Sequence, residues 1–138
     1  MLLDTHAWLF ASVDDPKRLG RRAGRLIEQG RSRGTLIVSV VSLFEIAALV
    51  TAGRLHLERS AESWIRQSIE FGRLRVIDIT AAIAIDAGSI PATSLPDPVD
   101  RILVATARTL GVPIATRDAR ILAYITATGA GRALDISK

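Results

Sequence analysis

The sequence predicts an α/β fold, in which a parallel sheet of five strands carries helices on both faces. Short apolar runs alternate along the chain with segments of helical periodicity, which is the pattern of strands connected by crossover helices. The 138 residues, 49% of them hydrophobic and 23% charged, are typical of one globular domain. We therefore expect a single domain over residues 1–138.

In the first half of the chain, each expected element has its own local signal. An acidic, proline-containing break at residues 14–16 separates the first two helices. The second of these helices has apolar side chains on one face and arginines on the others. The next strand is β-branched, and the helix that follows it ends at Gly53. The expected elements are a strand over residues 1–3, helices over 6–13 and 17–30, a strand over 36–41 and a helix over 42–52.

In the second half, prolines and glycines mark the boundaries. Three prolines between Ser89 and Pro98 predict a loop, and Gly111 ends the long helix that begins at Pro98. The expected elements are helices over residues 60–71, 80–88, 98–110 and 119–124, and strands over 74–79, 112–116 and 133–136.

Charge and composition limit the function. The net charge is +4, and the basic side chains are 16 arginines and two lysines, which favours an anionic partner. The absence of cysteine excludes a disulfide scaffold, a thiolate zinc site and a cysteine nucleophile. The N-terminus lacks the features of a secretory signal, and the longest apolar stretch, residues 35–50, contains Glu45 and is too short to cross a bilayer. We therefore expect a cytoplasmic protein without a membrane partner.

Four acidic residues recur at one structural position. Asp4 ends the first expected strand, Glu45 follows the second, Asp118 follows the fourth, and Asp100 lies at the start of the helix from Pro98. In a parallel sheet the carboxyl ends of the strands share one edge, where open α/β folds bind their ligands. The pattern predicts that these carboxylates lie close together.

Each acid also has a purely structural explanation. Asp4, Asp97 and Asp118 precede helices and are suited to be N-caps, and Ser42 with Glu45 fits a capping box. Asp100 is an acid in the first turn of its helix, where the helix dipole favours negative charge. An N-cap contributes about 1 kcal/mol, which is sufficient reason for any single acid.

The set as a whole is harder to explain by capping, because serine, threonine or asparagine caps a helix equally well. Crowded carboxylates repel each other, and a bound divalent cation removes that penalty. Ligation by oxygen alone indicates Mg²⁺ or Mn²⁺ rather than zinc. Such a site suits the hydrolysis of a phosphoester, in which the metal activates water.

Four segments of the chain resemble, in order and spacing, the motifs of PIN-domain ribonucleases, most closely the VapC-type toxins of bacterial toxin–antitoxin pairs. The segments are LLDTHAWL at residues 2–9, SLFEIA at 42–47, DPVDRILVATA at 97–107 and ATRD at 115–118. The chain departs from the usual pattern at Val99, where phenylalanine is common, and it lacks the lysine that often follows the glutamate.

The resemblance implies a three-layer α/β/α sandwich around a central five-stranded, mainly parallel sheet. It also implies a Mg²⁺-dependent endoribonuclease, with Mn²⁺ as a possible substitute, that forms a homodimer and has a cognate antitoxin. Because the expected pocket is acidic, we predict that the antitoxin inserts a basic residue there. The residues that match the family's metal-binding acids are Asp4, Glu45, Asp100 and Asp118.

Supporting roles are expected for a few further residues. Thr116 matches a hydroxyl residue that often supports the family's site, and Asp97, the extra acid of the motif, is expected mainly to cap its helix. Arg101, beside Asp100, either holds a carboxylate or meets the scissile phosphate, and the sequence leaves both possibilities open. An arginine-rich helix face is a weaker candidate for contact with RNA or antitoxin; it consists of Arg18, Arg21, Arg22 and Arg25.

Two other functions compete with a nuclease. The first is an α/β phosphatase with Asp4 as its nucleophile, although the chain lacks a second aspartate two residues on. The second is a non-catalytic module whose acidic pocket only binds the arginines of a partner.

Overall fold

One sheet forms the centre of the molecule in the computed structural model, which describes residues 1–13 and 18–138. The strand order is β3-β2-β1-β4-β5, and every neighbouring pair is parallel, which confirms the predicted parallel sheet. The strands are short: β1 (Leu2–Leu3), β2 (Ile37–Ser39), β3 (Arg75–Ile77), β4 (Ile114–Thr116) and β5 (Ala133–Asp135).

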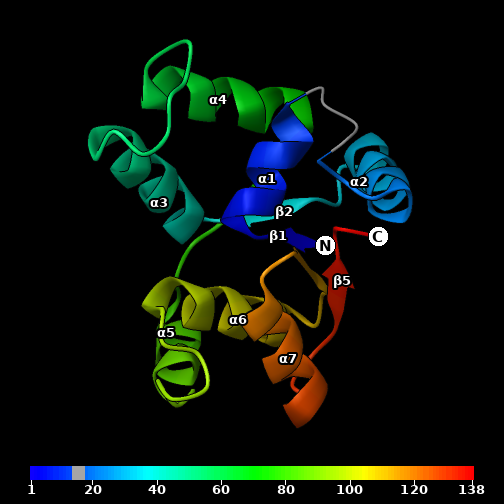
Figure 1. Cartoon of the computed structure of the whole chain (residues 1–138), viewed down its shortest axis with the longest axis vertical. Coiled ribbons are helices and arrows are strands. Elements are labelled where there is room, and N and C mark those ends of the chain that lie inside the picture. Colours follow the sequence, from blue (N-terminus) through cyan, green and yellow to red (C-terminus); the bar gives the residue numbers. More distant parts are fainter. Residues whose placement is uncertain (14–17) are drawn as a thin grey trace.

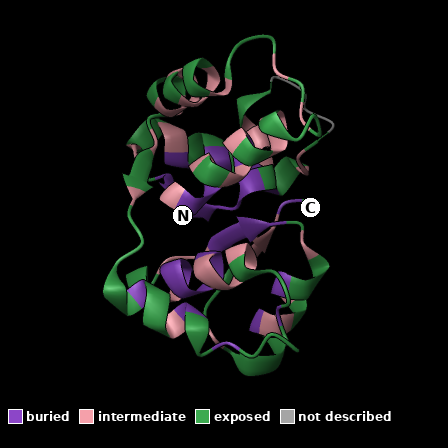
Figure 2. Cartoon of the chain, turned by 90° about the vertical axis from the view of Figure 1, so that its left-hand side faces the viewer, coloured by how far each residue is buried: buried purple, intermediate pink, exposed green. Residues whose placement is uncertain are grey.

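Helices cover both faces of this sheet, as Figure 1 shows and as the turned view of Figure 2 confirms. The first four helices lie on one face and the last three on the other, so the predicted three layers are present. The helices are α1 (Thr5–Ser12), α2 (Arg21–Arg33), α3 (Val40–Thr51), α4 (Ala61–Gly72), α5 (Ala81–Gly88), α6 (Pro98–Leu110) and α7 (Ala119–Thr128).

Successive side chains of each strand point to opposite faces of the sheet, so the strands contribute to two separate hydrophobic cores. In β1, the side chain of Leu2 packs into the core beneath α6 and α7, whereas that of Leu3 packs into the core beneath α1 to α4. Ile114 and Ala115 of β4 alternate in the same way, and all four side chains are fully buried. Strands buried on both faces explain why the sequence shows continuous apolar runs there.

The start of α3 corrects the sequence prediction. The helix begins at Val40, inside the residues expected as strand, because the hydroxyl of Ser39 accepts the N–H of Val41 at 3.2 Å and caps the helix. Ser42 is therefore not the N-cap, and the predicted capping box with Glu45 is wrong.

Two further helices have boundaries that differ from expectation by three or more residues. Helix α2 runs from Arg21 to Arg33, later than predicted; the predicted break at residues 14–16 and the predicted helix start at Lys17 fall outside the described residues. Helix α7 continues to Thr128, because the chain stays helical until Gly129, whose left-handed conformation at φ 64° ends the helix while its N–H donates to the carbonyl of Ile125. No helix in the described part of the chain combines the length and apolarity needed to cross a membrane.

Candidate active site

Three of the predicted acids cap helices. Each accepts a hydrogen bond from a backbone N–H in the first turn of the helix it precedes, so the structural explanation holds for each of them. Capping also fixes where these carboxylates point, because the cap bond ties the side chain to the helix N-terminus. The bonds run from Ala7 to Asp4 on α1, from Val99 to Asp97 on α6 (2.8 Å) and from Arg120 to Asp118 on α7 (2.7 Å).

Thr116 connects two of these acids. It is the last residue of β4, next to β1 in the sheet, and it is fully buried. Its hydroxyl accepts the backbone N–H of Asp118 at 2.9 Å and donates to the carboxylate of Asp4. One hydroxyl thus contacts two carboxyl-bearing residues, and the supporting role of Thr116 stays a prediction.

Burial and mutual repulsion act on these carboxyls. Asp4 is only 4% exposed, and burial raises its pKa although hydrogen bonds from Thr116 and Ala7 oppose the rise. Asp118 adds a repulsive contribution that raises the pKa of Asp4 further. The adjacent ends of β1 and β4 thus hold two carboxyls close enough to interact.

Asp100 shows that the whole set converges. Burial raises the pKa of Asp100 to about 7, with further increases from the charges of Asp97, Asp118, Glu45 and Asp4, in that order. Glu45, a half-buried residue of α3, is the member of this set that comes from a helix interior and not from a helix start. Acids from four separate segments therefore share one electrostatic environment, as the positions at the strand ends predicted.

The chemistry of this donor set fits a divalent cation. All the side chains offer carboxylate oxygens, the ligands that Mg²⁺ and Mn²⁺ prefer, and their repulsion would be relieved by positive charge. Within the described residues, no group of three or more such side chains is already arranged to hold an ion. Coordination would therefore need side-chain rotation, with the capped acids as the fixed ligands.

A second structural contact at the site was not anticipated from the sequence. The hydroxyl of Thr5, directly after Asp4, donates to the hydroxyl of Ser42 at 2.9 Å, and both side chains are buried. Ser42 precedes Glu45 by one turn of α3, so this bond joins the segments that carry two of the acids. Ser42 stands out in the sequence, but its spacing from Glu45 predicts a helix cap and not this contact with Thr5.

An open groove of about 430 Å³ lies over part of the acidic group. Asp4, His6, Phe10, Arg117 and Asp118 line it. Arg117 is exposed, and in the described part of the chain its guanidinium makes no ion pair with a carboxylate; it lies over the Phe10 ring, 5.4 Å from the centroid. Arg117 is therefore available to an anion in this groove.

Arg101 differs from Arg117. It is half-buried beside Asp100, and its Nε atom is buried without a hydrogen-bond partner in the described structure. No carboxylate lies within ion-pair distance of it among residues 1–13 and 18–138. The expected alternative in which Arg101 holds a site carboxylate thus has no ion pair to support it.

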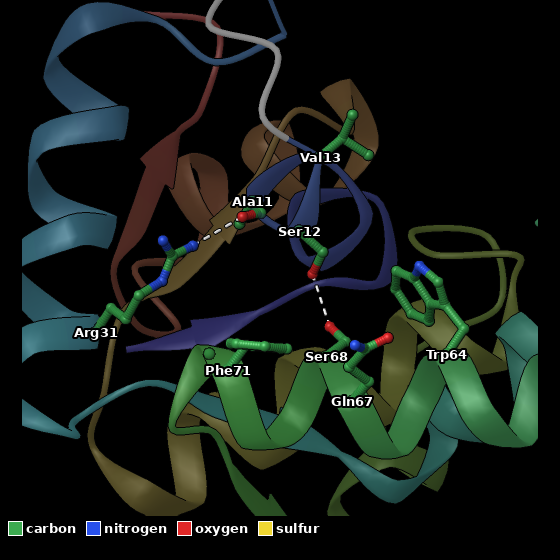
Figure 3. Close-up of a pocket in the computed structure, with 9 residues that line it drawn as sticks. Ala11, Ser12, Val13, Arg31, Trp64, Gln67, Ser68 and Phe71 are labelled. Atoms are coloured by element: carbon green, nitrogen blue, oxygen red, sulfur yellow. Dashed lines mark hydrogen bonds between the residues drawn. The ribbon is translucent and has the colours of Figure 1, made fainter. Parts of the chain in front are cut away.

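A larger hollow of about 510 Å³ lies away from the acids, between α1, α2 and α4 (Figure 3). Arg31 donates to the carbonyl of Ala11 at 2.8 Å there, and Ser12 and Ser68 share a hydrogen bond of 2.7 Å. No carboxylate lines this hollow among the described residues. This hollow therefore lacks the carboxylates that hydrolysis assisted by a divalent cation would need.

The two tryptophans pack against each other, Trp8 in the protein interior and Trp64 half-buried at the edge of the larger hollow. Trp8 is fully buried, its ring centroid lies 5.5 Å from that of Trp64, and its indole N–H donates to Ser68 at 2.7 Å. Trp8 therefore does not line the acidic groove.

Comparison with known proteins gives a consistent result. The family model of the PIN domain matches residues 1–125. Ribonuclease VapC22 of Mycobacterium tuberculosis is 33% identical over 124 residues, which span 90% of this chain and 91% of that protein.

Solved structures share the fold at lower identity. DNA-bound VapBC from Salmonella typhimurium matches with a TM-score of 0.66 and 21% identity, over 96% of this chain and 95% of that chain. VapBC2 from Rickettsia felis, bound to a promoter DNA fragment, matches with a TM-score of 0.68 and 15% identity, over 96% of each chain. FitAcB from Neisseria gonorrhoeae matches with a TM-score of 0.63 and 16% identity, over 96% and 95%.

Proposed function

Because the chain belongs to the PIN-domain family, and within it to the VapC group, we propose that it is a metal-dependent endoribonuclease that acts as the toxin of a toxin–antitoxin pair. The observation that carries this proposal is the convergence of Asp4, Glu45, Asp100 and Asp118 on one electrostatic environment beside an open groove. The ribonuclease name of the relative from M. tuberculosis supports RNA as the substrate.

Four side chains would hold the metal: Asp4, Glu45, Asp100 and Asp118. We propose Mg²⁺, with Mn²⁺ as a substitute, because both prefer carboxylate oxygens. When bound, the ion supplies an activated water and stabilises negative charge on the phosphate. Asp4 and Asp118 are oriented by their cap bonds, and Thr116 fixes their relative positions. Asp100 has a pKa of about 7, so it would release a proton on metal binding near neutral pH.

The proposal is tested by incubating purified protein with RNA in Mg²⁺, in Mn²⁺ and in EDTA. We expect cleavage that EDTA stops and that Asp4→Asn abolishes, whereas Asp78→Asn, the same change at an exposed aspartate, stays active. If the wild type cleaves no RNA in either metal, the chain is a binding module. If it hydrolyses only a small phosphomonoester and Asp4→Asn prevents this, the phosphatase hypothesis is correct.

An antitoxin is the proposed partner. Three solved relatives with this fold are described as VapBC or toxin–antitoxin complexes, which supports a partner of this kind. The acidic groove is complementary to a guanidinium or ammonium group, so we propose that a basic residue of the antitoxin enters it and competes with the metal. Replacing every basic residue of the inserting segment should restore cleavage. Unchanged inhibition would instead indicate that the antitoxin blocks the path of the RNA.

We also propose that the chain forms a homodimer. Several large apolar side chains are strongly exposed, among them Phe44, Phe71 and Ile85, with 68%, 75% and 75% of their surface accessible. A dimer interface would have to cover a contiguous patch that contains at least one of these side chains, because apolar side chains scattered singly over a surface are common in monomers. Light scattering on the purified toxin should give twice the mass of one chain, and a monomer at all concentrations would contradict this.

A further inference from the structure

Two neighbouring grooves share one aromatic residue. The acidic groove is lined on one side by Phe10 of α1. A second groove, of about 320 Å³ between α1 and α2, is also lined by Phe10, together with Arg21 and Arg25. Phe10 therefore lies at the boundary between the acids and the arginine-rich face of α2.

The surroundings of Phe10 are those of a surface that binds planar groups. Its ring is half-buried, the Arg117 and Arg18 guanidiniums lie 5.4 and 5.5 Å from its centroid, and the His6 ring lies 6.3 Å away at a tilt of 53°. Aromatic rings and guanidinium planes are the groups on which unpaired bases of single-stranded RNA stack. Among the described residues, the rings that line the acidic groove are those of Phe10 and His6, and neither tryptophan is among its lining residues.

Beyond Phe10, the second groove carries two arginines whose spacing suits successive contacts with a phosphate backbone. Arg21 and Arg25 are exposed, one helical turn apart, and line the same groove. Within the described residues neither has an ion pair, whereas Arg31 further along the helix pairs with Glu28 at 3.0 Å. A polyanion is repelled by the acids themselves, so cations beside the acids are needed to attract it.

We propose that single-stranded RNA crosses this surface, with a base stacked against Phe10 and Arg117 next to the acids and with backbone phosphates paired to Arg21 and Arg25. The inference rests on the proposed nuclease function and adds the surface along which the RNA extends from the acids, across Phe10 towards Arg21 and Arg25. An acidic protein segment also has charges that suit Arg21 and Arg25. RNA is favoured because the same surface joins the cations to an aromatic ring and to the acids.

The base contact is tested with Phe10→Leu, which keeps an apolar side chain but removes the ring, and with Phe10→Tyr, which keeps the ring. Binding of a short, fluorescein-labelled single-stranded RNA is measured by anisotropy in the Asp100→Asn background with Mg²⁺. We expect Phe10→Leu to bind about 5- to 150-fold more weakly and Phe10→Tyr to bind as tightly as the parent. In cleavage assays, KM should rise more than kcat falls, and the choice of cleavage site should broaden.

The phosphate contact is tested by a matched pair on one helix. Arg25→Ala and Arg33→Ala each remove one exposed cation from α2, and Arg33 lies at the far end, away from the groove. Arg25→Ala should lower the slope of log affinity against log salt by about 0.7, as for one phosphate contact with a single strand. Arg33→Ala and Phe10→Leu should leave this slope unchanged.

The outcomes separate this inference from the proposed function. If the wild type cleaves no RNA, the nuclease proposal is wrong. The proposed RNA surface, formed by Phe10, Arg117, Arg21 and Arg25, is then still tested by the binding measurements alone. If Phe10→Leu melts at the wild-type temperature and both it and Arg25→Ala bind RNA as tightly as the parent does, the proposed RNA-binding surface is wrong. If these two variants lose antitoxin affinity while RNA binding is unchanged, the surface belongs to the antitoxin and the inference is likewise overturned.

Discussion

Asp100→Asn should stabilise the metal-free protein several times more at pH 8 than at pH 4.5. In the folded chain the pKa of Asp100 is raised to about 7 from the ordinary value of 3.8. Between these two values the folded state holds a proton that the unfolded state has released, so stability falls as pH rises. Below the lower value no penalty exists, and above the upper value the penalty is complete. Asparagine never ionises and therefore removes the penalty.

The size of the effect follows from the same two values. A difference of about three pH units corresponds to an upper limit of about 4 kcal/mol. Asp100 is half-buried, so solvent screening reduces this to about 1–3 kcal/mol. The expected gain at pH 8 is therefore about 1–3 kcal/mol.

Denaturant unfolding in EDTA at the two pH values measures this difference directly. For a chain of this size, 1 kcal/mol corresponds to a shift of about 3–5 °C in Tm, so thermal melts also detect it. Glu58→Gln, at an exposed carboxylate in the loop between α3 and α4, is the control and should change stability equally at both pH values. If Asp100→Asn destabilises the metal-free protein at pH 8, or shifts it equally at both pH values, the carboxyls do not repel one another as described.

Three further changes have definite expected results. Thr116→Val removes the hydroxyl shared by Asp4 and Asp118, so it should cost about 1–3 kcal/mol in denaturant unfolding and reduce RNA cleavage. Asp86→Ala breaks the two 2.7 Å bonds to Arg108 that join α5 and α6; because both side chains are partly exposed, it should cost only about 1–2 kcal/mol and leave kcat unchanged. Millimolar Mn²⁺ should raise the Tm of the wild type more than that of Asp118→Asn, and equal shifts would exclude Asp118 as a ligand.

Local signals predicted some parts of the structure to the residue. Helix α6 begins and ends where expected, because Asp97 caps it, Pro98 suits its first position and Gly111 ends it in a left-handed conformation at φ 65°. The β-branched residues before Ser42 fit a strand or a helix equally well, and the Ser39 cap decides in favour of the helix. A boundary set by competing local preferences thus needs the tertiary structure.

The candidate site divides in the same way. The meeting of the acids was predictable, because it follows from strand ends that share one edge of a parallel sheet. The position of Phe10 between the acids and the arginines of α2 was not predictable, because it depends on how α1 packs beside α2 and on the contact with Arg117 from a distant segment. Contacts between side chains of separate elements leave no periodic signal in the sequence.

The most direct test of the metal site is the anomalous diffraction of Mn²⁺ in crystals of the purified protein. The structure predicts a Mn²⁺ peak in contact with the carboxylates of Asp4, Asp100 and Asp118, with Glu45 nearby, and no such peak in crystals of Asp4→Asn. A wild-type protein that cleaves RNA in Mn²⁺ but shows no peak at these acids, or shows its peak elsewhere, would contradict the account.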